Sequence, residues 1–159
     1  MPLKTGVFSV YEPPIDAPSI GEAPCAKNGF VTFGSFNNFA KISDSLLELW
    51  AKLLLEIPSS KLLIKNYSMR FDTVRKNVFD VFSKCGVDAD RLIIASRDAK
   101  QEDHFASFSN VDVALDSFPY SGTTTTCECL WMGVPVITLK GNSHRSRVTA
   151  GILNRIGLD

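Results

Sequence analysis

Apolar residues from Gly29 onward fall in short continuous runs, separated by longer segments in which they recur at helical spacing. The runs are four to six residues long and rich in β-branched, leucine or aromatic side chains, which is typical of strands buried in a sheet. We predict five strands, at residues 30–33, 61–64, 91–94, 111–115 and 134–139.

The segments between these runs place apolar residues three or four positions apart, which predicts amphipathic helices. The clearest helix begins at Ser43 or Ser45, since either is a good N-cap, and it ends before Pro58. Trp50 and Trp131 are expected to pack helices against the sheet. Further helices are predicted at residues 71–85, 101–108, 129–132 and 146–156.

Strands that alternate with helices along a chain are typical of a parallel sheet with helices on both faces. We therefore predict an α/β fold, a single Rossmann-like domain of about five parallel strands, formed by residues 29–159. Residues 1–28 contain five of the eight prolines and show no sustained periodicity. We predict that they form an extended linker, or a strap over another surface.

Polar segments follow each of the five predicted strands. Because ligands of such sheets bind outside the carboxyl ends of the strands, these segments are expected to converge on one rim and form the site. They comprise residues 35–41, 65–66, 96–104, 116–128 and 140–147.

The run Ser121-Gly-Thr-Thr-Thr-Thr-Cys-Glu128 connects the fourth strand to a helix. A turn through Gly122 into a helix presents backbone N–H groups at the positive end of the helix dipole, where phosphate binds well. The threonine hydroxyls add donors, and Glu128 is placed to accept hydrogen bonds from a ribose. The alternative is that a threonine simply caps the helix, but one would suffice for that. The run therefore indicates a nucleotide site, and we favour a nucleotide-sugar.

Charge, hydropathy and cysteine spacing argue against several classes of function. The 17 basic and 17 acidic residues balance, which gives no indication of a nucleic-acid groove or of binding to an acidic membrane. No apolar run is long enough to cross a bilayer, and the amino end lacks the pattern of a signal peptide. The four cysteines have no C-x-x-C spacing, so we expect free thiols, no metal site and a cytoplasmic protein.

Three stretches resemble the protein O-GlcNAc transferase and SPINDLY family: Phe33-Gly-Ser-Phe-Asn-Asn-Phe-Ala-Lys-Ile42, Leu115-Asp-Ser-Phe-Pro-Tyr-Ser-Gly-Thr-Thr-Thr-Thr-Cys-Glu128 and Leu130-Trp-Met-Gly-Val-Pro-Val-Ile-Thr138. The resemblance implies the carboxyl-side Rossmann-like half of a two-domain GT-B glycosyltransferase. In that family an amino-side half and a tetratricopeptide array come first. We therefore expect this chain alone to be inactive in transfer.

The resemblance also implies roles for individual residues. Lys41 matches the lysine that contacts the donor diphosphate and is the catalytic candidate. Thr123 and Gln101 stand where animal O-GlcNAc transferases have histidine and lysine. The sequence around Glu128 is more similar to that of SPINDLY proteins, which use GDP-fucose in plants. The residues expected to bind the nucleotide-sugar are Asn38, Lys41, His104, Gly122, Thr123, Thr124, Thr125, Glu128 and His144.

Several residues at the rim have alternative interpretations. Lys65 and Arg147 are weaker candidates for phosphate contact, because lysines at strand ends are common and the arginine could cap its own surroundings. Asp116 is expected to orient the Thr-rich turn and not to act as a base. No nucleophile–base pair or carboxylate pair typical of a hydrolase is evident.

Three functional hypotheses follow. The first is the donor domain of an inverting protein O-glycosyltransferase that transfers GlcNAc from UDP-GlcNAc, or fucose from GDP-fucose, to Ser or Thr without a metal or other cofactor. Its partners would be the donor, a protein acceptor and the amino-side half. The second is a non-catalytic nucleotide-binding or interaction module, and the third is a GT-B transferase that acts on a small molecule or glycan.

Overall fold

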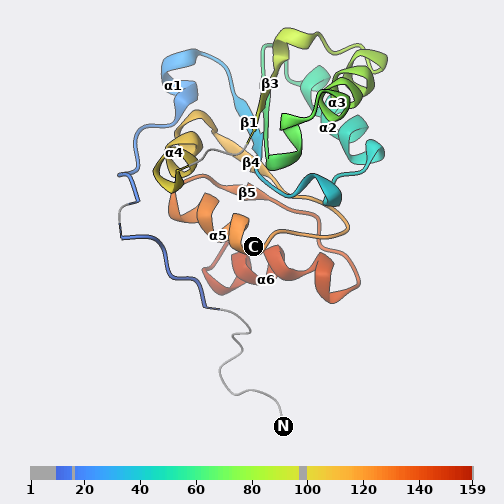
Figure 1. The fold of residues 1–159 in the computed structure, drawn as a ribbon. Coiled ribbons are helices and arrows are strands. Elements are labelled where there is room, and N and C mark those ends of the chain that lie inside the picture. Colours follow the sequence, from blue (N-terminus) through green and yellow to red (C-terminus); the bar gives the residue numbers. More distant parts are fainter. Residues whose placement is uncertain (1–9, 16, 97–99, 159) are drawn as a thin grey trace.

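The computed structural model describes residues 10–15, 17–96 and 100–158. Five parallel strands form one sheet in the order β3-β2-β1-β4-β5, which confirms the predicted α/β fold (Figure 1). The order places the two halves of the chain on either side of β1. The strands are β1 Thr32–Ser35, β2 Lys61–Lys65, β3 Leu92–Ala95, β4 Val113–Leu115 and β5 Val136–Ile137.

Helices connect the strands as the sequence predicts, and short 3-10 turns (η) add to them. The α-helices are α1 Pro24–Asn28, α2 Asp44–Glu56, α3 Asp72–Lys84, α4 Gln101–Ala106, α5 Thr124–Trp131 and α6 Val148–Arg155. The 3-10 turns are η1 Phe39–Lys41, η2 Tyr67–Arg70, η3 Ala89–Arg91, η4 Ser107–Asn110 and η5 His144–Ser146.

The two faces of the sheet have separate hydrophobic cores. Helices α2 and α3 cover one face, where Trp50 and Phe82 pack with Leu62 (Figure 1). Helices α4 and α5 cover the other face, and Phe108 belongs to that core. Trp50 is buried as predicted, but the prediction for Trp131 is wrong. Its side chain is 49% exposed because it lies on the outer side of the last turn of α5.

Local contacts fix both ends of α2. The N-cap is Ser43, whose hydroxyl accepts a hydrogen bond from the Leu46 amide, while Ser45 bonds only to the Ser43 hydroxyl. At the other end the guanidinium of Arg91 donates to the Leu54 and Ile57 carbonyls. Carbonyls at the end of a helix lack the backbone amides of a following turn as hydrogen-bond donors, and Arg91 supplies donors instead. Arg91 thereby joins the end of α2 to the start of β3.

The amino-terminal segment lies alongside α4 and α5 as a strap (Figure 1). Ala17 packs against the core under these helices, and Ile20 covers Gly133, where α5 has ended. The prediction of extended backbone is wrong at Pro24, which is the first residue of α1. Proline is tolerated there because the first helical N–H needs no helical partner, and the Asp112 carboxylate accepts from the next amide, that of Cys25.

Strand β1 lies two residues later than predicted and ends in small residues, Gly34 and Ser35. A Cβ at Gly34 would lie 2.6 and 2.7 Å from the two methyl carbons of Val111, which is buried. Glycine is therefore required where β1 passes the segment that leads into β4. Hydrophobicity alone therefore reveals the strand but not the residue at which it ends.

This close approach makes Gly34→Ala a test of the packing. We expect it to lower the free energy of unfolding by about 1–3 kcal/mol, because Val111 cannot move away inside a filled core. Urea unfolding measures the change. Gly21→Ala is the matched control, since no atom lies within 4 Å of a Cβ there. Equal stabilities of the two variants would contradict the close packing of β1.

Candidate functional site

The site lies where the strand order changes direction, between the carboxyl ends of β1 and β4. In doubly wound sheets this crevice is where nucleotides bind. Asn37 follows β1 and donates from Nδ2 to Oδ1 of Asp116, which follows β4, at 3.3 Å. This bond joins the two loops that form the sides of the crevice.

Asp116 organises the Thr-rich turn, as predicted. Its Oδ1 accepts from the amides of Ser117 and Gly122 at 2.9 and 2.7 Å, and its Oδ2 accepts from the Thr138 hydroxyl at 2.7 Å. The carboxylate is buried and already engaged by these donors. Its chemistry is therefore that of an anchor for the turn, not of a base.

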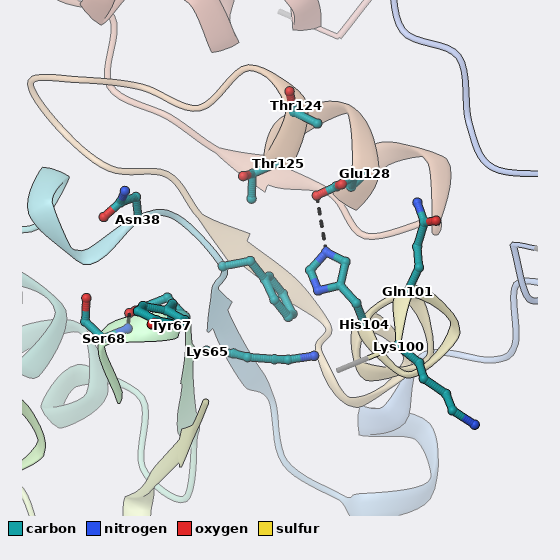
Figure 2. A pocket seen from close by; sticks show the side chains of 12 residues that line it. Asn38, Lys65, Tyr67, Ser68, Lys100, Gln101, His104, Thr124, Thr125 and Glu128 are labelled. Carbon is teal, nitrogen blue, oxygen red and sulfur yellow. Dashed lines mark hydrogen bonds and ion pairs between the residues drawn. The ribbon is translucent and has the colours of Figure 1, made fainter. Parts of the chain in front are cut away.

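A cavity of about 900 Å³ opens at this rim (Figure 2). Its volume is at the upper end of the range for small-molecule and cofactor sites. The wall residues come from the ends of β1 and β2 and from helices α4 and α5. They are Phe36, Asn38, Lys65, Asn66, Tyr67, Ser68, Lys100, Gln101, His104, Thr124, Thr125 and Glu128.

Figure 2 shows the cavity between two walls. Thr124, Thr125 and Glu128 project from α5 on one side, and Tyr67 and Ser68 lie on the other side. Five of the predicted binding residues line this one cavity: Asn38, His104, Thr124, Thr125 and Glu128.

Lys65 places a cation at the base of the cavity. The residue is buried, and its ammonium donates to the Ser107 hydroxyl at 2.7 Å. Lys100 also lines the cavity, but its side chain points away from the middle (Figure 2). Of the two lysines, Lys65 has the more restricted side chain, because that side chain is buried and hydrogen-bonded to Ser107.

The first turn of α5 forms part of the cavity wall through Thr124 and Thr125. Thr123 is the N-cap residue and makes no capping hydrogen bond with its side chain. The Thr126 hydroxyl bonds to that of Thr149 in α6 at 2.9 Å and is buried. The four threonines therefore differ: Thr126 joins two helices, whereas Thr124 and Thr125 reach the cavity. The amides of an uncapped helix start attract anions.

Glu128 and His104 are paired across the cavity wall. His104 Nε2 lies 3.4 Å from Glu128 Oε2, and both side chains are largely shielded from solvent (Figure 2). The imidazole meets the rings of Phe36 and Phe108 edge-on, with interplanar angles of 86° and 75°. This aromatic packing fixes the ring, which in turn fixes the carboxylate.

Lys41 lies beside the turn, outside the set of residues that line the cavity. Its ammonium donates to the Ser121 carbonyl at 3.2 Å and lies 4.1 Å from the centroid of the Tyr120 ring. Burial lowers the pKa of Lys41, and the negative charge of Asp116 partly offsets that effect. The ammonium lies against the Ser121 carbonyl and the Tyr120 ring, in the turn that leads into α5.

Gly122, Thr123 and His144 are predicted binding residues that do not line the cavity either. The Gly122 amide is engaged by Asp116, and a Cβ there would lie 2.7 Å from the Thr126 hydroxyl oxygen. Close packing accounts for this glycine. His144 lies in η5, and Arg147 donates from Nε to the Gly141 carbonyl at 2.7 Å. Residues 97–99 of the predicted rim lie outside the described residues.

Tyr67 and Ser68 line the cavity, and Tyr11 lies near Glu128; the sequence interpretation missed all three. Tyr67 and Ser68 directly follow a predicted rim segment, so extending it by one turn would have included them. Tyr11 belongs to the strap, and its hydroxyl is buried without a hydrogen-bond partner among the described residues. Burial raises the pKa of Tyr11, and the nearby Glu128 and Cys127 raise it further. No pattern in the sequence indicates this proximity.

Within the described part of the chain, no three His, Cys, Asp or Glu side chains are grouped so that they could hold a metal ion. The four cysteines are free thiols, as expected. None of the described helices combines the length and apolar character that a membrane span requires.

Comparison with known proteins agrees with this geometry. The chain is 40% identical over 151 residues to a Petunia hybrida protein named probable UDP-N-acetylglucosamine–peptide N-acetylglucosaminyltransferase SPINDLY, covering 95% of this chain and 16% of that protein. A Caenorhabditis elegans UDP-N-acetylglucosamine–peptide N-acetylglucosaminyltransferase is 31% identical over 129 residues, covering 80% of this chain and 11% of that protein. The chain thus spans about one sixth or less of the length of these relatives.

A solved structure of an O-GlcNAc transferase mutant from Thermobaculum terrenum superposes with a TM-score of 0.85 at 38% identity. The superposed region covers 92% of this chain and 27% of the Thermobaculum terrenum chain. The model of glycosyl transferase family 41 matches residues 25–159. These findings confirm the resemblance and the assignment to glycosyltransferases, and the chain belongs to glycosyl transferase family 41.

Proposed function

We propose that this domain binds the nucleotide-sugar donor of an inverting protein O-glycosyltransferase. The enzyme transfers N-acetylglucosamine from UDP-N-acetylglucosamine to a Ser or Thr hydroxyl of a protein. One observation carries this proposal: the 900 Å³ cavity places the uncapped start of α5, two threonine hydroxyls and the Glu128 carboxylate on one wall. Amides and hydroxyls suit a diphosphate, and a carboxylate one turn further on suits a ribose.

The proposed chemistry needs stabilisation of the leaving group. The acceptor oxygen attacks the anomeric carbon from the face opposite the diphosphate, the carbon–oxygen bond to the diphosphate breaks, and negative charge develops on the phosphate oxygens. Thr124, Thr125 and the α5 amides would bind that charge, and Lys41 would add an ammonium beside them. These groups can supply the positive field, so we expect no metal. The acceptor and the group that takes its proton would come from outside this domain.

The names of the relatives support this choice of donor and acceptor. Both the Petunia hybrida and the Caenorhabditis elegans proteins are named for UDP-N-acetylglucosamine and for transfer to peptides. Because the sequence from Pro119 to Glu128 resembles that of SPINDLY proteins, GDP-fucose remains the second candidate donor. The two donors differ in base as well as sugar, so nucleotide binding separates them.

Isothermal titration calorimetry with UDP and GDP, each with and without magnesium, tests the proposal. We expect UDP to bind more tightly than GDP and to bind equally well without magnesium. A preference for GDP would assign the domain to a fucosyltransferase. Binding that requires magnesium would contradict the role given to Lys41 and α5. Failure of both nucleotides to bind would contradict a donor site in this domain.

Glu128 provides a specific test of the ribose contact. We expect Glu128→Ala to weaken UDP binding about tenfold, because a hydrogen bond to a charged acceptor is lost. The same substitution should leave the affinity for 2′,3′-dideoxy-UDP unchanged, since that ligand has no hydroxyl to donate. Calorimetry measures both. Glu102→Ala, at an exposed position on α4, is the control for loss of one negative charge. An equal loss for both ligands would contradict the ribose contact.

A further inference from the structure

Tyr120 is an exposed aromatic residue with no place in either core. It lies in the turn between β4 and α5, and its side chain is 49% exposed. Its ring does not belong to the hydrophobic cluster on either face of the sheet. Core packing therefore does not account for an aromatic residue here.

The contact that Tyr120 does make is with Lys41. The ammonium lies 4.1 Å from the ring centroid, well inside the range of cation–π attraction. A second contact, the hydrogen bond to the Ser121 carbonyl at 3.2 Å, holds the same ammonium from the neighbouring residue. Lys41 comes from η1, about 80 positions earlier in the sequence, so the turn holds a side chain from the other half of the fold.

The backbone that carries this ring is held in place. The Tyr120 carbonyl accepts from the Ser117 hydroxyl at 2.7 Å. The Ser121 amide and hydroxyl both donate to the Arg145 carbonyl in η5, at 2.9 and 2.8 Å. Exposed long side chains normally sample many rotamers, and a fixed ring face restricts those of the lysine.

From these contacts we propose that Tyr120 is a positioning residue for Lys41. The ring and the Ser121 carbonyl occupy two directions around the ammonium and leave it a further N–H donor for a phosphate oxygen. The inference rests on the proposed function, because it gives the oriented charge a purpose at the diphosphate. Tyr120 itself needs no contact with the donor.

The position of Lys41 can be measured without any nucleotide. In a carbon-13 NMR spectrum, the ring current of Tyr120 should move the Lys41 Cε–H signals upfield, and Lys41→Arg identifies those signals by their loss. We expect the upfield shift to persist in Tyr120→Phe, which keeps the ring, and to vanish in Tyr120→Leu. Trp131→Leu is the matched control, because Trp131 is equally exposed but sits at the far end of α5. An unchanged signal in Tyr120→Leu would overturn the proposal.

A double-mutant cycle then tests the consequence for binding. We expect Tyr120→Leu to weaken UDP binding about twofold to fivefold, the size of a partly exposed cation–π contact, and Tyr120→Phe to restore it. In a Lys41→Met background Tyr120→Leu should have no further effect. Equal losses in both backgrounds, or no rescue by phenylalanine, would overturn the proposal. If the wild-type chain bound neither UDP nor GDP, the proposed function would fail, and the NMR signal would still decide whether Tyr120 positions Lys41.

Discussion

Asp116→Ala is expected to lower the free energy of unfolding by about 3–5 kcal/mol, the largest loss of stability among the changes considered. The carboxylate accepts from two backbone amides, an amide side chain and a hydroxyl, and the residue is buried. Alanine would leave these donors without this partner in a largely buried region. Urea unfolding followed by circular dichroism measures the loss.

Asp116→Asn is the matched control. Its amide oxygen can still accept from Ser117 and Gly122, and its amide nitrogen can donate to the Thr138 hydroxyl. We therefore expect it to retain most of the stability that alanine loses. If the two variants were equally stable, the hydrogen bonds to the carboxylate would not be what holds the turn.

Lys41→Met is expected to weaken UDP binding by about tenfold to hundredfold, because it removes a charge-assisted contact with the diphosphate. The change leaves the length and apolar character of the side chain nearly intact. Stability should change little, since Lys41 is only partly buried and belongs to neither core. Calorimetry measures the affinity. Lys52→Met, an exposed lysine on α2, is the control for lost charge.

The pH dependence of UDP binding is a second test of the role of the Lys41 charge. Burial lowers the pKa of Lys41, so its ammonium loses its proton at a lower pH than an ordinary lysine does. Binding needs the charged form. It is therefore full below the pKa of Lys41 and falls as the pH rises through it, while the phosphates stay ionised. In Lys41→Arg the guanidinium keeps its charge, and the alkaline fall should disappear. A fall that persists in Lys41→Arg would contradict this assignment.

Most of the fold could be predicted from the sequence because its elements are locally specified. All five strands and the helices between them occur where apolar runs and helical spacing alternate. The end of β1 was predicted two residues too early because its last residues, Gly34 and Ser35, are small and not hydrophobic. At Gly34 close packing against Val111 requires the small residue. Trp131 was assigned to the core from residue type alone, which does not show which side of a short helix faces the sheet.

The site was predicted in part, for a related reason. Residues that follow strand ends are brought together by the parallel sheet itself, so Thr124, Thr125 and Glu128 could be placed with Asn38. Contacts between distant loops leave no such trace in a sequence. The cation–π contact of Lys41 with Tyr120 and the approach of Tyr11 to Glu128 depend on how the strap and the turn pack.

The most direct test of the donor site is NMR mapping of backbone amides in the wild-type chain during titration with UDP and, separately, with uridine. We expect UDP to shift the amide signals of Thr124 and Thr125, and we expect uridine, which has no phosphate, to leave them in place. Such a result would locate the diphosphate at the start of α5. If UDP left these amides unmoved, or if uridine moved them equally, α5 would not be the phosphate site and the proposed function would be contradicted.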